Sequence, residues 1–473
     1  MSDYGLIING EKVPTEDGFP VINPATEEVV GQCPFATRDQ LDRAVRAASE
    51  AFIDWSRVAD AERAAACGRI ADALTAHAEE LASLLTREQG KPLNGLGSRF
   101  ELGGAAAWAG HTGTLALPDV VIQDDETARV VQTRKPVGVV GSITPWNWPL
   151  LIAVWHIVPA IRTGNTVVIK PSPYTPLSTL RMVEIMNEVL PPGVLNCVTG
   201  EDELGQWMTE HPYIQKIIFT GSINTGKKVM GSSAKSLKRL TLELGGNDAG
   251  IILDDVDPAA VAPGIIAGAF LNNGQTCAAL KRLYVHDSIY DDMCAKLVEA
   301  ASNVKMGNGL EEDTMQGPIQ NKMQYDKVVG LFEDAVAHGG RVLCGGRIPD
   351  GPGYFMPYTL VADVSDGMRI VDEEQFGPLL PIIRYTGLDD AIRRANGLET
   401  GLGGSVWSAD VERGAEIAAR LECGTAWVNS HGGIAPNVPF GGVKCSGIGV
   451  EFGEEGLKEY TTIQVLNVSK AAA

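Results

Sequence analysis

Positive charge is scarce in this sequence. It has 39 Lys and Arg residues against 59 Asp and Glu residues, a formal net charge of −20 at pH 7. A surface of that sign repels the phosphate backbone of nucleic acids and the anionic leaflet of a membrane. We therefore expect neither nucleic acid nor a membrane among its partners.

Long apolar runs and closely spaced cysteines are also lacking. The most apolar segment, 148–161, is shorter than a bilayer span and contains Pro149, His156 and Pro159, which indicates burial inside the protein. The eight cysteines form no C-x-x-C pair and no Cys/His cluster of metal-ligand spacing, so no metal is expected. With an N-terminus that lacks the features of a signal peptide, this pattern predicts a reducing, cytoplasmic location.

The 473 residues, 44% of them hydrophobic, can bury a large core in more than one domain. Thr37 and Gln40 form a capping-box pattern ahead of an alanine-rich helix. A second helix is predicted from about residue 60 to 88, with Gly90 and Pro92 as its stop signal. The first third of the chain is thus expected to be largely helical.

Strand-like and helix-like segments alternate from residue 130 onward. Apolar strands are expected at 166–170, 194–198, 216–220 and 249–253, each followed by a turn and a helix-compatible stretch. Parallel strands need such crossover helices, so the pattern predicts an α/β fold with a doubly wound parallel sheet. A second alternating series beyond Cys277 indicates another α/β domain.

The segment 216–230 resembles a phosphate-binding loop, since an apolar strand runs into Gly221, Ser222 and the start of a helix. Its spacing nearly matches G-x-x-x-x-G-K-[ST], but Lys228 replaces the hydroxyl residue, which argues against an ATPase. The standard G-x-G-x-x-G fingerprint does not occur. An ordinary strand-to-helix turn and a cofactor loop stay equally open here.

Two residues could supply reactive groups. Glu243 ends a largely apolar strand, where it is either a structural ion-pair partner or, with a raised pKa, a general base. Cys277 lies in a polar turn between Thr276 and Ala278, and such small neighbours leave room for an electrophile. Most cysteines are inert core residues, and a nearby cation or helix N-terminus is needed to lower the pKa of this one.

Asn147 lies between two tryptophans and two prolines. Its amide is either a structural brace or the fixed donor that an oxyanion hole requires. Glu374 and Phe376 stand in a second turn, EEQFGP, where a loop salt bridge is the plain alternative.

Together the segments PWNWP, GNTVVIKPS, FTGS, LELGG, GQTC, EEQFGP and PFGGVKCSGIG resemble the aldehyde dehydrogenase superfamily, in the same order along nearly the whole chain. The resemblance implies that Cys277 is the nucleophile and Glu243 the general base. It also implies an oxyanion hole formed by the Asn147 side chain and the Cys277 backbone N–H. The expected reaction is oxidation of an aldehyde to a carboxylic acid through a thiohemiacetal and a thioester, without a metal.

The resemblance further implies a variant of the Rossmann fold that binds NAD. Lys170 and Glu374 would hold ribose hydroxyls and Ser222 the pyrophosphate. The complete expected cofactor set is Thr144, Trp146, Lys170, Ser172, Gly221, Ser222, Leu244, Glu374 and Phe376. Many NAD-preferring members carry a glutamate where this chain has Pro173, and Ser172 could donate to a 2′-phosphate, so NADP use stays open.

The expected aldehyde is apolar or aromatic. Trp148, Leu151, Ile152 and Trp155 recur at helical spacing and, with Thr276, would line a substrate tunnel, although the same stripe could be plain core. Neither this stretch nor the immediate surroundings of Cys277 in the sequence contains Lys or Arg, so an acidic aldehyde lacks a counter-charge there.

The expected organisation is a cofactor domain of residues 1–117 and 141–243, a catalytic domain of 244–442, and oligomerisation strands at 118–140 and 458–470. These strands imply a homodimer or homotetramer, although either could be an ordinary edge strand. Two alternatives to hydrolytic aldehyde oxidation are an acylating relative that passes the thioester to CoA or phosphate, and a catalytically silent nucleotide-binding protein. Glu243 argues against the first alternative, and the joint presence of Cys277, Glu243 and Asn147 argues against the second.

Overall fold

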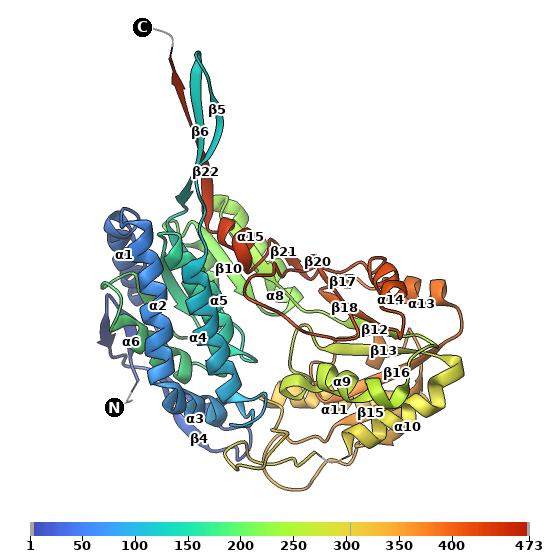
Figure 1. Cartoon of the computed structure of the whole chain (residues 1–473). Helices are drawn as coiled ribbons and strands as arrows, with labels where there is room; N and C mark the ends of the chain where they lie inside the picture. Colours follow the sequence, from blue (N-terminus) through green and yellow to red (C-terminus); the bar gives the residue numbers. More distant parts are fainter. Residues whose placement is uncertain (1–3, 303, 471–473) are drawn as a thin grey trace.

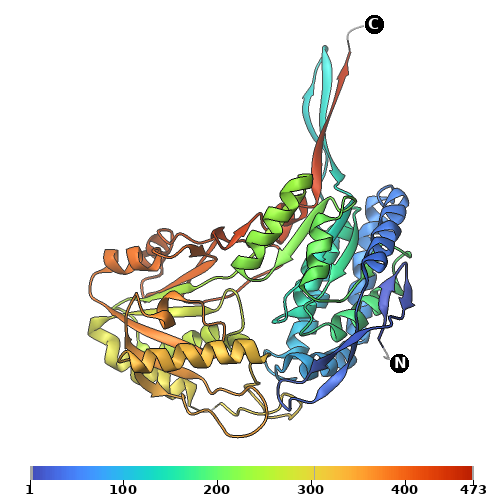
Figure 2. The ribbon, with the colours of Figure 1, turned by 180° about the vertical axis from the view of Figure 1, so that it is seen from behind.

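A computed structural model describes residues 4–302 and 304–470. The first three residues of the expected segment 1–117 therefore lie outside the described part. Two α/β bodies lie side by side, and a long β-arm projects from the body that contains the N-terminus (Figure 1). The view from behind shows the same two bodies and the same projecting arm (Figure 2). No helix among the described residues is both long and apolar enough to cross a membrane.

The first body is built on an eight-stranded sheet with the order β2-β1-β9-β8-β7-β10-β11-β21. Its five central strands are parallel. They are β7 (Val139–Ile143), β8 (Thr166–Lys170), β9 (Leu195–Cys197), β10 (Lys216–Thr220) and β11 (Arg239–Glu243). The order reverses between β7 and β10, and ligands of such sheets bind beyond the carboxyl ends of the strands at this switch point.

Helices cover both faces of this sheet, which confirms the predicted α/β class. Separate apolar cores occupy the two faces, one containing Leu41 and Met208, the other containing Ile70 and Ile157. The helices of this body are α1 (Arg38–Trp55), α2 (Asp60–Ala76), α3 (Ala78–Gln89), α4 (Ser98–Thr114), α5 (Pro149–Arg162), α6 (Leu177–Asn187), α7 (Asp202–Glu210), α8 (Ile223–Ser233), η1 (Ala234–Ser236) and α15 (Gly453–Lys458).

The capping box at the start of α1 is confirmed. The Thr37 side chain accepts from the Gln40 backbone N–H, and the Gln40 side chain accepts from the Thr37 backbone N–H. The single helix predicted at 60–88 is wrong, because His77 (φ −107°, ψ 16°) separates α2 from α3. The apolar spacing continues across this break, so the pattern did not reveal it. Gly90 ends α3 in the left-handed region at φ 93°, as its position predicted.

The edges of the first sheet come from the two ends of the chain. β1 (Leu6–Ile8) and β2 (Glu11–Val13) add antiparallel at one edge. β21 (Gly447–Ile448) pairs with β11 at the other edge, and Gly447 lies opposite Glu243. A hairpin of β3 (Gly18–Ile22) and β4 (Val29–Pro34) also precedes α1. None of these edge elements was predicted from the sequence.

The second body contains a seven-stranded sheet with the order β14-β15-β16-β13-β12-β18-β19, parallel except for the β14/β15 pair. Its strands are β12 (Asp248–Ile252), β13 (Leu280–His286), β14 (Arg341–Cys344), β15 (Thr359–Val364), β16 (Leu379–Tyr385), β18 (Gly403–Trp407) and β19 (Thr425–Val428), with a small β17 (Thr400–Gly401) and β20 (Val443–Lys444) pair beside them. Its helical segments are α9 (Pro258–Phe270), η2 (Leu271–Gly274), η3 (Asp287–Ile289), α10 (Tyr290–Ala301), α11 (Lys322–Ala337), α12 (Arg369–Asp372), α13 (Leu388–Ala395) and α14 (Val411–Ala418).

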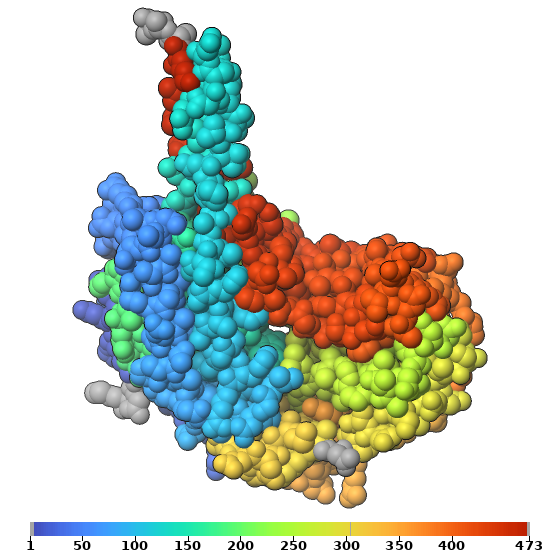
Figure 3. Space-filling model, in the orientation of Figure 1, coloured from blue at the N-terminus to red at the C-terminus, as the bar shows by residue number. Residues whose placement is uncertain are grey.

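The arm is a three-stranded antiparallel sheet in the order β22-β6-β5. β6 (Ala128–Pro136) lies between β5 (Val120–Asp124) and β22 (Thr461–Ser469). The space-filling view shows that the arm stands clear of both bodies (Figure 3). Its exposed apolar side chains are Val120, Val121, Ile122, Ile463, Val465, Leu466 and Val468.

Candidate active site

Cys277 lies on a strained turn that connects α9 to β13. Asn272, Asn273 and Gly274 follow one another in the left-handed region, at φ 50°, 60° and 72°. A Cβ atom on Gly274 would lie 2.1 Å from the Gly377 carbonyl oxygen, so this position accepts no side chain. Strained backbone of this kind concentrates at functional sites. The Cys277 side chain that follows the turn is half-buried.

The expected oxyanion donor lies next to this turn. The Asn147 side-chain amide donates to the Gln275 carbonyl oxygen at 2.9 Å, and the Trp148 indole N–H donates to the Thr276 hydroxyl at 3.0 Å. These bonds attach the segment ahead of α5 to the two residues that precede Cys277. The amide group of asparagine has two N–H donors, so one remains for a developing negative charge.

A buried ion pair holds the backbone of Asn147. The Lys91 ammonium donates to the Asn147 carbonyl oxygen at 2.8 Å and pairs with Glu101. Glu101 in turn accepts from the backbone N–H groups of Leu150 and Leu151, in the first turn of α5. The Lys91 ammonium also lies 3.6 Å from the centre of a Trp148 ring, a cation–π contact. The start of α5 is therefore fixed by charge as well as by packing.

Glu243 is a buried carboxylate at the end of β11. Among the described residues neither of its side-chain oxygens has a hydrogen-bond partner, so the ion-pair alternative finds no support. Burial, followed by the charge of Glu451, raises the pKa of Glu243 well above its ordinary value. A carboxylate in such surroundings can accept a proton near neutral pH.

The Cys277 thiol is held in its protonated form by its surroundings. Burial raises the pKa of Cys277 to about 12, the charge of Lys281 lowers this pKa, and the carboxylates of Glu243, Asp248 and Glu374 raise it further. A thiol in this state needs a base before it can react as a thiolate.

The strand ends at the switch point carry the expected cofactor residues. Thr144 directly follows β7, and its buried hydroxyl has no hydrogen-bond partner among the described residues. Gly221 and Ser222 follow β10, and Ser222 caps α8 by accepting from the Thr225 backbone N–H at 3.3 Å. A Cβ atom on Gly226 would lie 2.5 Å from a Leu244 methyl group, so the helix start approaches β11 closely. An anion site at this helix N-terminus fits the geometry.

Two further expected residues extend this surface. Lys170, at the end of β8, is buried and donates to the Pro171 carbonyl oxygen at 3.3 Å. Burial lowers the pKa of Lys170 to about 8, and the charge of Asp202 opposes this effect. Ser172 is buried nearby in the chain, and its hydroxyl accepts from the Tyr174 backbone N–H at 3.3 Å.

Trp146 and Phe376 face each other. Their ring centres lie 5.3 Å apart in an edge-to-face arrangement, although the two residues come from distant parts of the sequence. Phe376 lies in the left-handed region at φ 53°. Beside it the Glu374 carboxylate pairs with Lys281 at 2.6 Å, so the salt bridge considered for this loop does form.

Comparison with known proteins identifies the family. Residues 12–466 match the model of the "Aldehyde dehydrogenase family". The chain belongs to the aldehyde dehydrogenase family. It is 37% identical to the phenylacetaldehyde dehydrogenase of Pseudomonas fluorescens, over 98% of this chain and 96% of that protein. It is 38% identical to the chloroplastic betaine aldehyde dehydrogenase of Beta vulgaris, over 97% and 95%.

Solved aldehyde dehydrogenase structures have the same fold. The NAD+ complex of the Bacillus cereus aldehyde dehydrogenase superposes with a TM-score of 0.95 at 36% identity, covering 98% of this chain and 96% of that one. Betaine aldehyde dehydrogenase of Staphylococcus aureus in complex with NAD+ gives a TM-score of 0.95 at 34% identity, covering 100% and 96%. The matches span both bodies and the arm.

The expected substrate stripe of this aldehyde dehydrogenase is packed. Trp148, Leu151, Ile152 and Trp155 are all buried in the core around α5. Trp155 packs against Phe452 with ring centres 4.7 Å apart, and it borders a small cavity that Trp108 also lines. Thr276 is more open, since it is only half-buried.

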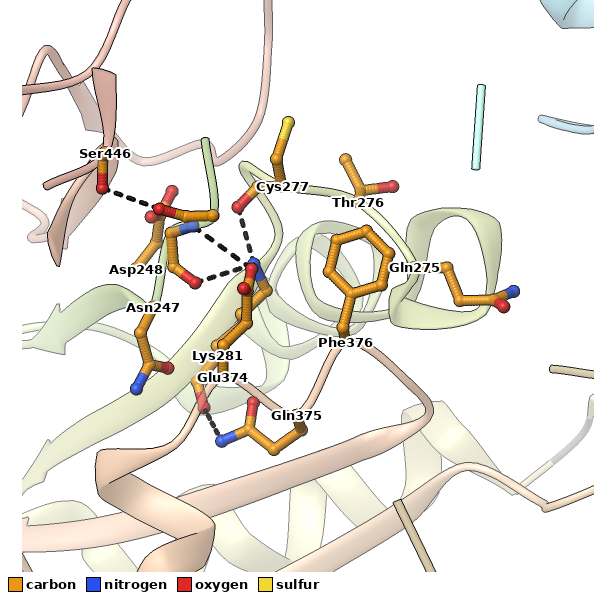
Figure 4. Close-up of polar contacts among 12 residues, drawn as sticks. Asn247, Asp248, Gln275, Thr276, Cys277, Lys281, Glu374, Gln375, Phe376 and Ser446 are labelled. Atoms are coloured by element: carbon orange, nitrogen blue, oxygen red, sulfur yellow. Dashed lines mark hydrogen bonds and ion pairs between the residues drawn. The ribbon is translucent and has the colours of Figure 1, made fainter. Parts of the chain in front are cut away.

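A cation that was not predicted lies at the Cys277 loop. No Lys or Arg was expected beside Cys277, yet the Lys281 ammonium donates to the Cys277 carbonyl oxygen at 2.6 Å. Figure 4 shows that the Cys277 sulfur points away from this lysine while the carbonyl oxygen points toward it. Lys281 lies four residues after Cys277, in β13, and the contact forms because its side chain reaches back to the Cys277 carbonyl oxygen.

Lys91, Glu101 and Glu451 were not predicted either, nor was Asn272, whose side-chain amide donates to the Asn147 carbonyl oxygen at 2.8 Å. Lys91 was noticeable as a charge between Gly90 and Pro92, but its contact with Asn147 spans 56 residues of the chain. The described residues contain no group of three or more His, Cys, Asp or Glu side chains placed to hold a metal ion.

Proposed function

We propose that this chain oxidises an aldehyde to its carboxylic acid, with Cys277 as the nucleophile, Glu243 as the general base and NAD or NADP as the hydride acceptor. The observation that carries the proposal is the hydrogen bond from Asn147 to Gln275. It holds an amide donor beside the loop of a half-buried thiol. The family membership, with a buried and unpartnered Glu243 whose charge acts on the same thiol, supports it.

The residues divide the chemistry between them. Glu243 removes the thiol proton, and the Cys277 sulfur forms a bond to the carbonyl carbon while the C=O π electrons move to oxygen. The free Asn147 N–H and the Cys277 backbone N–H donate to that oxygen. When bound, the nicotinamide cofactor supplies the acceptor for the hydride of the aldehyde carbon. After Glu243 has released the thiol proton to solvent, it deprotonates the water that attacks the Cys277 thioester. The C–S bond then breaks as the carboxylic acid forms, and the departing thiolate takes the proton from Glu243.

The residues at the switch point fit a dinucleotide. An unpartnered Thr144 hydroxyl, a capped helix N-terminus at Ser222 and a buried Lys170 with donors to spare are the features such a ligand uses. Lys170 and Glu374 would hold ribose hydroxyls, Ser222 the pyrophosphate, and Trp146, Leu244 and Phe376 would border the ligand. NAD is the first choice because the two solved relatives are NAD+ complexes. Pro173 leaves room for NADP.

An apolar or aromatic aldehyde is the proposed substrate class. Lys281 and Lys91, the two lysines that contact the Cys277 and Asn147 segments, are already paired with Glu374 and Glu101. Neither is free to bind an acidic substrate. The aromatic cluster around Trp155 and the similarity to a phenylacetaldehyde dehydrogenase support this class.

We further propose the domain division stated for the sequence, with a cofactor domain of 1–117 and 141–243, a catalytic domain of 244–442 and oligomerisation strands at 118–140 and 458–470. The exposed apolar side chains of the arm support association of two or four copies, because patches of this kind mark interaction surfaces.

The test is a panel of aromatic, aliphatic and acidic aldehydes with each nicotinamide cofactor, followed by absorbance of the reduced cofactor. Cys277→Ala is expected to abolish turnover and to retain cofactor binding. Oxidation that persists in this variant would rule out the nucleophile. Formation of an acyl-CoA or acyl phosphate in place of the acid would favour the acylating alternative. If the protein binds the cofactor but reduces it with none of the aldehydes, the catalytically silent nucleotide-binding alternative would be favoured.

A further inference from the structure

Lys281 joins three segments of the site. Its ammonium donates to the Cys277 carbonyl oxygen at 2.6 Å, to the Gly246 carbonyl oxygen at 3.2 Å and to the Glu374 carboxylate at 2.6 Å (Figure 4). A lysine has three N–H donors, so this set uses all of them. The side chain is buried, with 3% of its surface exposed. Because each N–H donor of the buried ammonium has an acceptor, the position of the Lys281 side chain is well defined.

The carboxylate of Glu374 is fixed from a second side. Its Oε1 also accepts from the Gly246 backbone N–H at 3.2 Å. A Cβ atom on Gly245 would lie 2.5 Å from Oε2, so the carboxylate packs against a turn that only glycine allows. This turn begins two residues after Glu243. The lysine therefore links the loop of the nucleophile, the strand end of the base and the loop of Glu374.

We propose that Lys281 is a positioning residue for this reaction. It orients the Glu374 carboxylate for the cofactor ribose, and it fixes the backbone of the Cys277 loop. This inference rests on the proposed function, in which Cys277 reacts and Glu374 holds the cofactor.

The charges that act on the Cys277 thiol come from four elements. Lys281 of β13 favours the thiolate, whereas Glu243 of β11, Asp248 of β12 and Glu374 of the loop after α12 oppose it. Because the sulfur points away from Lys281, the lysine acts through its field and through the backbone rather than by a hydrogen bond to sulfur (Figure 4). Lys281 and Glu374 should thus have opposite effects on the reactivity of the thiol.

The first test measures alkylation of Cys277 by iodoacetamide against pH, without aldehyde or cofactor, with the modified peptide identified by mass spectrometry. Lys281→Met should slow alkylation at pH 8 about tenfold, the effect of one pKa unit on the thiolate fraction. Glu374→Gln should accelerate it, and the double variant should return close to the wild-type rate. A merely disrupted loop would move both single variants in the same direction. That outcome, or a wild-type rate in Lys281→Met, would overturn the proposal.

The second test measures binding of NADH by fluorescence. Lys281→Met should raise the dissociation constant several-fold because Glu374 loses its orientation, and Lys281→Arg should recover part of the affinity. Lys327→Met is a matched control. The Lys327 ammonium donates to the backbone carbonyl oxygen of Glu374 at 2.7 Å, whereas Lys281 donates to its carboxylate. Equal losses in the Lys281 and Lys327 variants would overturn the positioning role. Failure of the proposed function can be distinguished from failure of the positioning role. The former appears as turnover in Cys277→Ala or as an inactive wild type.

Discussion

The Asn147 side-chain amide donates to the Gln275 carbonyl oxygen at 2.9 Å, across the junction between the two bodies. Asn147 precedes α5 of the first body, and Gln275 precedes the first long strand after α9 in the second. The bond therefore fixes the position of the Cys277 loop relative to the Asn147 side-chain amide. A small shift of one body against the other would separate the thiol from its oxyanion partner.

Asn147→Ala should lower kcat by about 10²- to 10³-fold, the loss found when one oxyanion donor is removed. Steady-state absorbance of the reduced cofactor measures this effect. Asn147→Asp preserves the size but replaces the donor by a charge, so it should be at least as slow. An alanine variant with wild-type kcat would show that the amide is only a structural brace.

Glu243→Gln should separate the two halves of the reaction. Without its base the thioester is hydrolysed slowly, so stopped-flow absorbance should show a burst of reduced cofactor followed by slow turnover. The burst itself should be slower than in the wild type, because in the proposed reaction Glu243 also removes the thiol proton. Full loss of the burst, with the Cys277 thiol still open to alkylation at high pH, would show that Glu243 is already required before hydride transfer and would contradict a role limited to hydrolysis.

Glu451→Gln should shift the acidic limb of the rate profile to lower pH. The charge of Glu451 raises the pKa of Glu243, so its removal lowers that pKa, and the deprotonated base is then present at lower pH. The measurement is kcat against pH. Glu412→Gln, an exposed position on α14, is the control and should leave the profile in place. An unmoved limb in Glu451→Gln would contradict the assignment of that limb to Glu243.

Glu101→Gln should lower the free energy of unfolding by about 3 kcal/mol. The change leaves the Lys91 ammonium buried without its counter-charge, and breaking a buried pair costs about 3–5 kcal/mol. Denaturant unfolding measures the loss, and a matched surface change, Glu312→Gln, should cost far less. A loss below about 1 kcal/mol would mean that the ion pair adds little to the stability of this region.

Pro173→Glu should reduce the use of NADP more than the use of NAD. A carboxylate at this position repels a 2′-phosphate and can accept from ribose hydroxyls. We expect kcat/KM with NADP to fall at least about tenfold, whereas kcat/KM with NAD changes little. Pro173→Gln, which has the same size without the charge, is the control. Equal losses with both cofactors would place residue 173 away from the 2′ position.

Local patterns predicted the central strands well. The segments 166–170 and 216–220 coincide with β8 and β10, because apolar β-branched runs bounded by turns are strong strand signals. The assignment of strands to sheets was beyond such patterns. The segment at 249 continued the first alternating series, but β12 lies in the second sheet, since the pairing depends on where the chain crosses between bodies. The short edge strands β1, β2 and β21 carry too few residues for a period to be visible.

The residue types of the site could be predicted, but their electrostatic surroundings could not. Motifs marked Cys277, Glu243 and Asn147, yet the chain positions alone say nothing of the Lys281 contact with Glu374 or of the Lys91 contact with Asn147. Each pair joins residues far apart in the sequence within one body, so it forms only once the helices and strands of that body have packed. For the same reason, the sequence did not decide whether Trp148, Leu151, Ile152 and Trp155 form part of the core or line a substrate tunnel.

The pairing of β21 with β11 has a consequence for synthesis on the ribosome. Gly447 closes the open edge beside Glu243, and this edge stays bare until nearly the whole polypeptide has left the exit tunnel. A nascent chain therefore carries its reactive sulfur for a long interval before the proton acceptor beside it is fully enclosed. A product that ends before Gly447 lacks the strand that covers Glu243, and it should therefore be inactive.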